Sequence, residues 1–239
     1  MTKNQIQVKN STEYFNMPIE YQNLVLHQLR QHAEGELIGA DDYLEYFYPI
    51  APDAFERKVC CERASEEVDH YMLAAAVLKD IGYDASHMLK QNIDQRQFYK
   101  TEGVVKVKSW IMRGFFSFIG EAAVLALIEE MSESSYLPIV EMTRQVIIDE
   151  YVHVVNGRRI VEEFVLKNGA HIAQKEFEEA WAMSLDLFGD SNSERSKQYL
   201  KWGLRKYSNG EARERFVKKI SPQLEALGFV IPVGSVGRK

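Results

Sequence analysis

The chain has 239 residues, of which 46% are hydrophobic and 27% are charged, and its formal net charge is −6. This composition is typical of an ordinary globular protein. Acidic and basic residues are interleaved and form no basic stripe for phosphates, so we expect no nucleic-acid partner. No uninterrupted apolar run reaches the ~18 residues that cross a bilayer, and the amino terminus lacks a secretory signal pattern, which favours a cytoplasmic protein without a membrane segment.

Apolar residues recur with a helical period, and no segment is typical of a strand. A first helix is expected from about Pro18 to Tyr48, and a second from Pro52, placed in its first turn, to Gly82. Residues 83–103 are polar and suggest a short surface helix or a lid.

A third helix is expected from about Val104 to Met131, and it contains the most apolar stretch of the chain, GFFSFIGEAAVLALI. The turn SESSYLP leads into a fourth helix that ends at Gly169. Three shorter amphipathic segments follow, at about 170–187, 193–207 and 210–227. We therefore predict an all-α fold in a single domain over 1–239: a four-helix bundle over about 18–169, and a C-terminal helical appendage over about 170–232.

Two of the long helices carry a glutamate three residues before a histidine, in the middle of the helix: Glu67 with His70, and Glu150 with His153. That spacing places both side chains on one helix face, about one turn apart. Helices joined by a short loop run antiparallel, so residues equidistant from the loop lie at the same height. Glu36 mirrors Glu67 across the first loop, and Glu121 mirrors Glu150 across the turn SESSYLP.

Each hairpin thus offers a lone glutamate and a glutamate–histidine pair, which is the ligand pattern of ferritin-like bundles that bind two iron or manganese ions. Hard carboxylates and borderline imidazoles suit such ions and leave positions open for oxygen. We predict two iron ions, with manganese as an alternative. The predicted metal-ligating and catalytic residues are Glu36, Glu67, His70, Glu121, Glu150 and His153.

The acidic residues close to Glu36 and Glu121 in sequence fit the ligand pattern less well than these two glutamates do. Glu36 has apolar residues above and below it on its helix stripe, whereas Glu34 shares a polar stripe. Glu121 is the only ionisable residue in a long apolar stretch, where an unpaired carboxylate would cost several kcal/mol without a compensating cation. Glu129 and Glu130 fit the turn poorly and are predicted to mark a solvated helix end.

The residues that precede two of the ligands, Glu66 and Asp149, are candidates to accept hydrogen bonds from the histidine of the opposite pair. His32, four residues before Glu36, could contact that glutamate from outside the ligand set, but a place on a polar helix edge is favoured. His27 and His171 are expected at the surface.

A simpler interpretation remains open. With 35 acidic residues, a glutamate or aspartate three residues before a histidine can arise by chance, as at Asp84 and His87. Charged helix faces usually contact solvent, so a metal-free bundle is the alternative. The basic group Lys201, Arg205 and Lys206 could meet a phosphate, but a solvated helix edge is favoured.

The sequence resembles the phenylacetic acid catabolic protein family, within the ferritin-like di-iron superfamily. The similarity extends from about Gln22 to Pro232 and is most specific towards the carboxyl terminus. It is carried by the stretches QHAEGELIGADD, EEVDH, DEYVH and FGDSNSERSKQYLKWGLRKYSNGEARERFVKKISPQLEALGFVIP.

This resemblance implies a di-iron monooxygenase of epoxidase type that activates O2 and oxygenates an aromatic or acyl-CoA substrate, in the breakdown of aromatic compounds. It also implies an electron-donating reductase, a related noncatalytic subunit and a homo- or hetero-oligomer, with this chain as the ligand-bearing member. Two alternatives stay open: a ferroxidase or peroxide-handling protein, and a noncatalytic partner subunit. The sequence leaves the substrate, the coenzyme A contacts and the choice of metal undecided.

Overall fold

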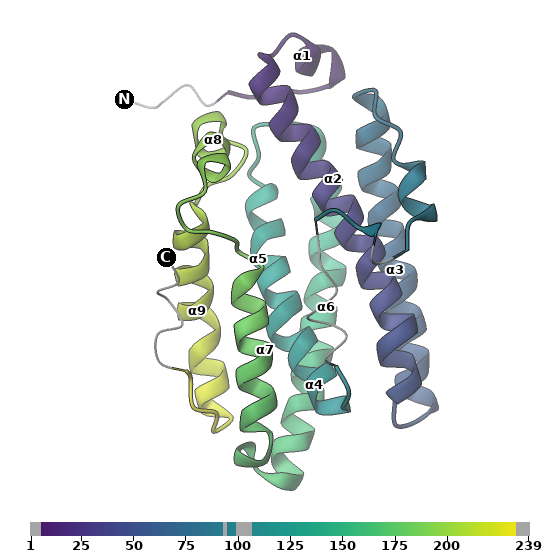
Figure 1. Ribbon diagram of the computed structural model, residues 1–239, viewed down its shortest axis with the longest axis vertical. Coiled ribbons are helices and arrows are strands. Elements are labelled where there is room, and N and C mark those ends of the chain that lie inside the picture. The colour runs from purple at the N-terminus through teal and green to yellow at the C-terminus, as the bar shows by residue number, and fades with distance from the viewer. Residues whose placement is uncertain (1–5, 93–94, 99–106, 233–239) are drawn as a thin grey trace.

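The computed structural model describes residues 6–92, 95–98 and 107–232. Over these residues the chain is helical, and the only strand-like pairing is an isolated parallel bridge between Val8 and Tyr136. The all-α prediction is therefore confirmed, and the long helices lie side by side along one axis (Figure 1).

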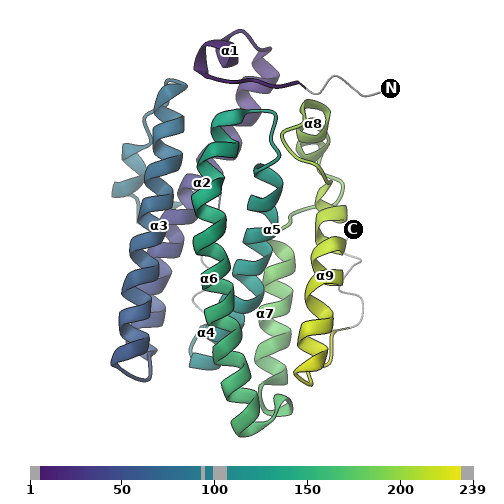
Figure 2. The same cartoon turned by 180° about the vertical axis from the view of Figure 1, so that it is seen from behind.

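Two helical hairpins build the bundle, as Figures 1 and 2 show from opposite sides. A short helix, α1 (Ser11–Phe15), precedes them. The first hairpin joins α2 (Ile19–Asp42) to α3 (Ala54–Asp80) through the π-helical turn η1 (Tyr43–Phe47) and the 3-10 turn η2 (Tyr48–Ile50). The second joins the rod α4 (Trp110–Phe115), η6 (Phe116–Glu121) and α5 (Ala122–Met131) to α6 (Leu137–Asn168), and η6 is also π-helical.

The helix starts differ in detail from the prediction. Asp53 is the N-cap of α3, where its side chain accepts a hydrogen bond from the backbone N–H of Glu56, so Pro52 precedes the helix instead of lying in its first turn. The third helix begins at Trp110, because Ser109 is its N-cap and its side chain accepts a hydrogen bond from the backbone N–H of Met112. Residues 107–109 are not helical, so the start predicted at about Val104 was wrong, although 104–106 themselves lie outside the described residues.

The C-terminal segments form η7 (Ala170–Ala173), α7 (Gln174–Asp186), α8 (Glu194–Trp202) and α9 (Asn209–Ala226). Helices α7 and α9 lie beside the α4–α5 rod, on the side away from α3 (Figures 1 and 2). Helix α8 ends earlier than predicted because Gly203, with φ of +68°, takes the left-handed conformation that ends helices. The one-domain organisation stays a prediction.

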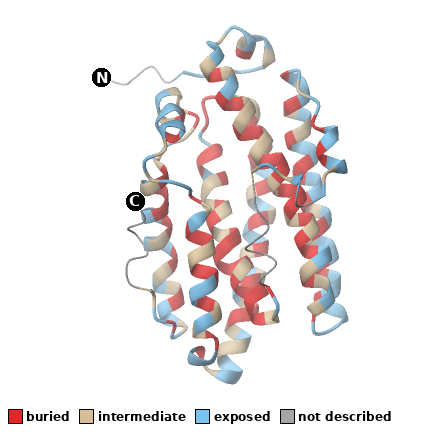
Figure 3. Cartoon of the chain, in the orientation of Figure 1, coloured by how far each residue is buried: buried red, intermediate tan, exposed pale blue. Residues whose placement is uncertain are grey.

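The apolar third helix is the central rod of the molecule. Phe115 and Phe118 share one buried cluster with Phe177, Trp181 and Phe216 of the C-terminal helices. Among the described residues, 110–131 form a helix long and apolar enough to cross a membrane, but 72% of its apolar 18-residue window is buried inside the protein. Covered by α6 and α7, this rod is a core helix, and buried residues follow the inner faces of the helices (Figure 3).

The polar segment after α3 packs on the outer face of α2 and includes the 3-10 helix η3 (Ser86–Lys90). The backbone N–H of Phe98 donates to Glu34 at 2.6 Å, and Arg96 pairs with Asp41 at 3.1 Å. Glu34 is consequently only 1% exposed, although it lies on the polar stripe of α2 and outside the group of candidate ligands. Residues 93–94 and 99–103 of the predicted surface segment lie outside the described residues.

Glu130 is buried instead of marking a solvated helix end. It accepts hydrogen bonds from the Arg205 side chain and from the backbone N–H groups of Lys206 and Tyr207. The basic group of the C-terminal segment is thereby neutralised by carboxylates of the bundle, because Lys201 and Lys206 also pair with glutamates. This geometry favours a structural role for the group over phosphate binding.

Candidate metal centre

The six predicted ligands come from four helical segments and meet at one level of the bundle interior. In α2, α3 and α6 the ligand residues lie among the buried residues of the helix, and η6 is almost wholly buried. All six side chains are buried, with exposed fractions between 0% for the histidines and 7% for Glu121. The structure therefore brings together Glu36 of α2, Glu67 and His70 of α3, Glu121 of η6, and Glu150 and His153 of α6.

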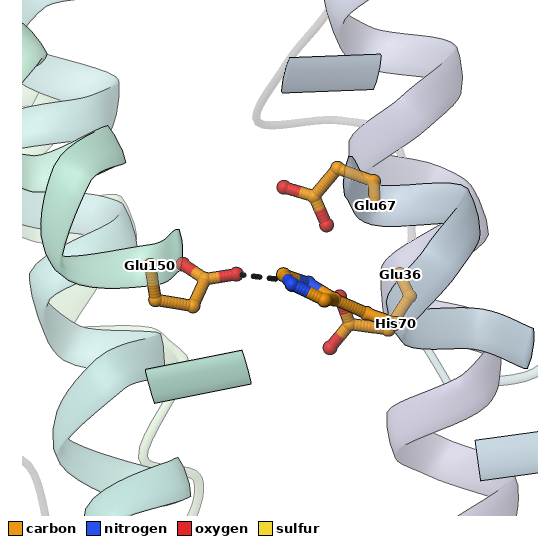
Figure 4. A group of neighbouring side chains, drawn as sticks. All are labelled: Glu36, Glu67, His70 and Glu150. Atoms are coloured by element: carbon orange, nitrogen blue, oxygen red, sulfur yellow. Dashed lines mark hydrogen bonds and ion pairs between the residues drawn. The ribbon is translucent and has the colours of Figure 1, made fainter. Parts of the chain in front are cut away.

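Their ligand atoms form two groups that share one residue. In each group, one ligand atom per residue can be chosen so that all of them lie within 4.8 Å of one another. The first group, drawn in Figure 4, is Glu36, Glu67, His70 and Glu150; the second is Glu67, Glu121 and His153. Glu67 belongs to both, so its carboxylate lies between two places where an ion could be held.

Glu150 also lies between the two histidines. Its Oε1 is 3.8 Å from Nδ1 of His70, the contact marked in Figure 4, and its Oε2 is 3.8 Å from Nδ1 of His153. Each histidine thus turns Nδ1 towards the carboxylates. His70 Nδ1 is also 3.1 Å from Glu36, and His153 Nδ1 is 3.4 Å from Glu67.

The other ring nitrogen of each histidine meets a carboxylate from the opposite hairpin. Nε2 of His70 is 3.2 Å from Asp149, and Nε2 of His153 is 2.8 Å from Glu66. The predicted crosswise pairing is therefore confirmed. A carboxylate at Nε2 fixes the ring orientation and leaves Nδ1 as the nitrogen that faces the centre.

Glu66 and Asp149, the carboxylates that contact Nε2 of the two histidines, have different hydrogen-bonding partners of their own. Arg63, one turn earlier on α3, pairs with Glu66 at 2.6 Å. Asp149 instead accepts hydrogen bonds from the neutral amide of Gln145, at 2.9 and 3.1 Å. His153 is thus backed by a carboxylate that pairs with an arginine, and His70 by a carboxylate that is hydrogen-bonded to a neutral amide.

His32 is a neighbour of the centre whose role the sequence did not favour. It is only 8% exposed, and its Nδ1 lies 2.9 Å from Oε1 of Glu36, one helical turn later on α2. The predicted place on a polar helix edge was wrong. The four-residue spacing to Glu36 was the available signal.

Tyr43 was missed as a functional neighbour. Its hydroxyl donates a hydrogen bond to Oε1 of Glu121 at 2.8 Å, and its ring lies 5.9 Å from that of His153. The guanidinium of Arg113, itself fully buried and bonded to Asn156, lies 5.5 Å above the same ring. Burial, and next the Glu121 charge, raise the pKa of Tyr43, so this hydroxyl keeps its proton and serves as a donor.

The remaining histidines lie outside the group of candidate ligands. Asp84 and His87 are exposed, and the Asp84 side chain accepts a hydrogen bond from the backbone N–H of Ser86, so this pair lies outside the candidate metal centre. His171 is exposed, as predicted. His27 is half-buried instead of lying at the surface, with Nδ1 2.9 Å from the Tyr199 hydroxyl, and burial lowers its pKa to about 4.

The electrostatics of the centre reflect four carboxylates held together in the interior. Burial raises the pKa of Glu67 to about 8, and burial together with the Glu67 charge raises that of Glu150. Burial also opposes the ionisation of Glu36, but His32 and His70 outweigh it and hold its pKa well below the ordinary range. Burial opposes the charged form of His153, yet Glu66 and Glu67 raise its pKa well above the usual value.

Three polar atoms of the candidate ligands are buried and have no hydrogen-bond partner among the described residues: Oε2 of Glu121, Oε2 of Glu150 and Nδ1 of His153. Buried polar atoms are normally satisfied, and unpaired ones call for an explanation such as an ion. A cation would satisfy all three and relieve the repulsion between the carboxylates. Oxygen and imidazole donors in this number fit iron or manganese.

Comparison with known proteins gives two related findings. The family described as "Phenylacetic acid catabolic protein" matches residues 8–238. The chain is also 23% identical over 222 residues to one of the subunits of the 1,2-phenylacetyl-CoA epoxidase of Escherichia coli (strain K12), and the match covers 90% of this chain and 71% of that protein.

Proposed function

The chain belongs to the phenylacetic acid catabolic protein family, and we propose that it is the metal-bearing subunit of a di-iron oxygenase that oxygenates an aromatic or acyl-CoA substrate. One observation supports this most strongly: two groups of buried ligand atoms share Glu67. A single structural ion would need one such group, whereas a pair of ions suits the joint reduction of dioxygen.

The six candidate ligands would be distributed over two ions. Glu36, His70 and Glu150 would hold one ion, Glu121 and His153 would hold the other, and Glu67 belongs to both groups of ligands. When bound, the iron pair supplies the binding and reduction of O2. The metal-binding roles of the six residues rest on the distances and burial given above and on the resemblance to the family.

The surrounding residues would orient this centre and keep it dry. Asp149 and Glu66 hold the two imidazole rings, and the Tyr43 hydroxyl holds one oxygen of Glu121. Burial of all six ligands excludes bulk water, which strengthens electrostatic interactions and limits side reactions. Oxygen activation would therefore take place in a pre-arranged, largely desolvated site.

Partners follow from the chemistry. Insertion of one oxygen atom from O2, with the other released as water, consumes two electrons and two protons that the chain cannot supply by itself. We infer an electron-donating reductase and, because the relative is named as one of several subunits, a related noncatalytic subunit in a larger complex. Substrate candidates are aromatic acyl-CoA thioesters, of which phenylacetyl-CoA is the first to test.

The first experiment determines metal content and oxygen consumption. Protein expressed with ample iron should hold about two ions per chain. Reduced protein mixed with phenylacetyl-CoA should consume O2 and give an oxygenated product by mass spectrometry. Glu150→Ala should lose both metal and product, while Glu129→Ala, on the exposed side of α5, should lose neither.

Each alternative has its own outcome. Oxidation of ferrous iron or breakdown of peroxide at full rate, with no organic product in any reduced mixture, would replace the proposal by a ferroxidase or peroxide-handling function. Far less than two ions per chain, with Glu150→Ala spectroscopically unchanged, would point to a noncatalytic subunit.

A further inference from the structure

The carboxylate of Glu67 occupies space that a missing side chain on α2 provides. Gly39 lies three residues after Glu36, on the same helix face. A Cβ atom placed on Gly39 would lie 2.8 Å from Cδ of Glu67, 2.8 Å from Oε2 and 3.2 Å from Oε1. Real Cβ atoms essentially never come closer than 3.0 Å to another heavy atom. Any other residue at this position would therefore displace the carboxylate itself.

The backbone gives no other reason for glycine here. Gly39 lies inside the continuous helix Ile19–Asp42, and it is absent from the described glycines with positive φ. Glycine in a helix interior is less stable than alanine. Gly120, beside the ligand Glu121, offers a contrast, because a Cβ there would lie 3.7 Å from Ser184 Oγ, an ordinary contact.

We propose that Gly39 is a positioning residue: the absence of its side chain keeps the Glu67 carboxylate between the two ion positions. The inference rests on the proposed di-metal centre and adds a residue that itself binds no metal. Glu67 is the one residue common to both ligand groups, so its displacement removes a ligand from at least one of them.

An alanine at position 39 would affect metal binding more than folding. The clash involves the end of a glutamate side chain, which can rotate away, and alanine strengthens the helix. Residues that orient metal ligands typically change metal affinity by about ten- to a hundred-fold. We expect a loss of that size for one of the two ions in Gly39→Ala.

Titration of metal-free protein with Co(II) tests this directly, since the absorption of bound Co(II) counts ions and reports their coordination. Wild type and Gly120→Ala should each bind two ions. Gly39→Ala should bind one tightly and the second at least tenfold more weakly. Thermal unfolding with chelator present should show Gly39→Ala at least as stable as wild type.

A second variant tests the steric cause. In Gly39→Ala/Glu67→Asp the carboxylate is one methylene shorter and withdraws from the new methyl group. The double variant should bind the second ion more tightly than Gly39→Ala does, although Glu67→Asp alone should weaken it, and this non-additivity is the signature of direct contact. If Gly39→Ala fails to fold, folding of the double variant supports the proposal, and failure of both overturns it.

The remaining outcomes separate this inference from the proposed function. If wild type binds two ions and Gly39→Ala binds both with unchanged affinity, the role of Gly39 is overturned and the di-metal centre stands. Additive effects in the double variant overturn it as well. If wild type binds no metal, the proposed function fails and this inference fails with it.

Discussion

Nε2 of His70 lies 3.2 Å from Asp149, the residue that directly precedes the candidate ligand Glu150 on α6. One turn of α6 therefore contributes both to the centre and to the orientation of a histidine from the other hairpin. His153 and Glu66 repeat the relationship in the opposite direction at 2.8 Å. The two hairpins are thus linked crosswise by these two contacts, so each hairpin orients a candidate histidine ligand of the other.

This crosswise link predicts that Asp149→Ala weakens metal binding without removing a ligand. Loss of a carboxylate behind a ligating histidine typically costs about ten- to a hundred-fold in affinity. Isothermal titration of the metal-free protein with Mn(II) would measure the change. Glu141→Ala, at an exposed position of the same helix, is the matched control. Equal affinities for Asp149→Ala and the control would contradict the prediction.

Helical period and loop position were sufficient to predict the six residues at the centre. Antiparallel hairpins place residues equidistant from a turn at the same height, and the turns after Phe47 and Met131 do bisect their pairs. The crosswise role of Glu66 and Asp149 followed because consecutive residues on a helix point in different directions, one inwards and one sideways. The spacing of residues along each helix and the position of each turn were therefore enough for these predictions.

The sequence did not predict the burial of Glu34 and Glu130 or the contact between Tyr43 and Glu121, because these depend on features outside the regular helical repeat. Glu34 is buried by residues beyond α3, and Glu130 by the segment between α8 and α9. The π-helical turns η1 and η6 depart from the 3.6-residue repeat. Tyr43 begins one of them and Glu121 ends the other, so a regular helical projection could not show that their side chains meet.

The hydrogen bond from Tyr43 to Glu121 predicts a stability cost for Tyr43→Phe. The variant keeps the ring packing but leaves a buried carboxylate oxygen without its donor. Hydrogen bonds to charged groups contribute about 1.5–3 kcal/mol, and we expect a loss of that order in the unfolding free energy. Urea unfolding with chelator present measures it. Tyr151→Phe, at a position that is 63% exposed, should change little; an equal loss in both would exclude the bond as the cause.

Gly157→Ala should destabilise the contact between α6 and η6 more than Gly39→Ala destabilises the contact between α2 and α3. A Cβ there would overlap the backbone nitrogen of Phe118 and lie 2.5 Å from Cβ of Ser117. Backbone cannot rotate away as the Glu67 side chain can, so α6 would have to move. Overpacking of this kind typically costs about 1–3 kcal/mol.

The measurement for Gly157→Ala is urea unfolding of the metal-free protein, with Gly120→Ala as the control in the adjoining helix. We expect Gly157→Ala to lose both stability and metal affinity, because Glu150 and His153 move with α6. Stability equal to that of Gly120→Ala would show that the two helices can separate freely, and would remove the reason for glycine at this contact.

The raised pKa values predict how the stability of the metal-free protein depends on pH. Burial raises the pKa of Glu67 from 4.5 to about 8, so between these values the folded protein holds a proton that the unfolded chain has lost. The contribution of this group is therefore fully present below 4.5 and is lost as pH rises through about 8. The raised pKa of Glu150 acts in the same direction, so the melting temperature with chelator should fall across this range.

Bound metal should change this dependence, because an ion replaces the protons that the carboxylates otherwise hold. The stabilisation produced by excess Mn(II) should grow as pH rises over the same interval, since fewer protons compete for the ligands. Glu67→Gln cannot ionise, so its metal-free melting temperature should vary less with pH than that of wild type. Parallel thermal melts with chelator and with Mn(II) test both statements. A metal-free profile that rises with pH, or a Glu67→Gln profile identical to that of wild type, would show that Glu67 is ionised in the folded protein.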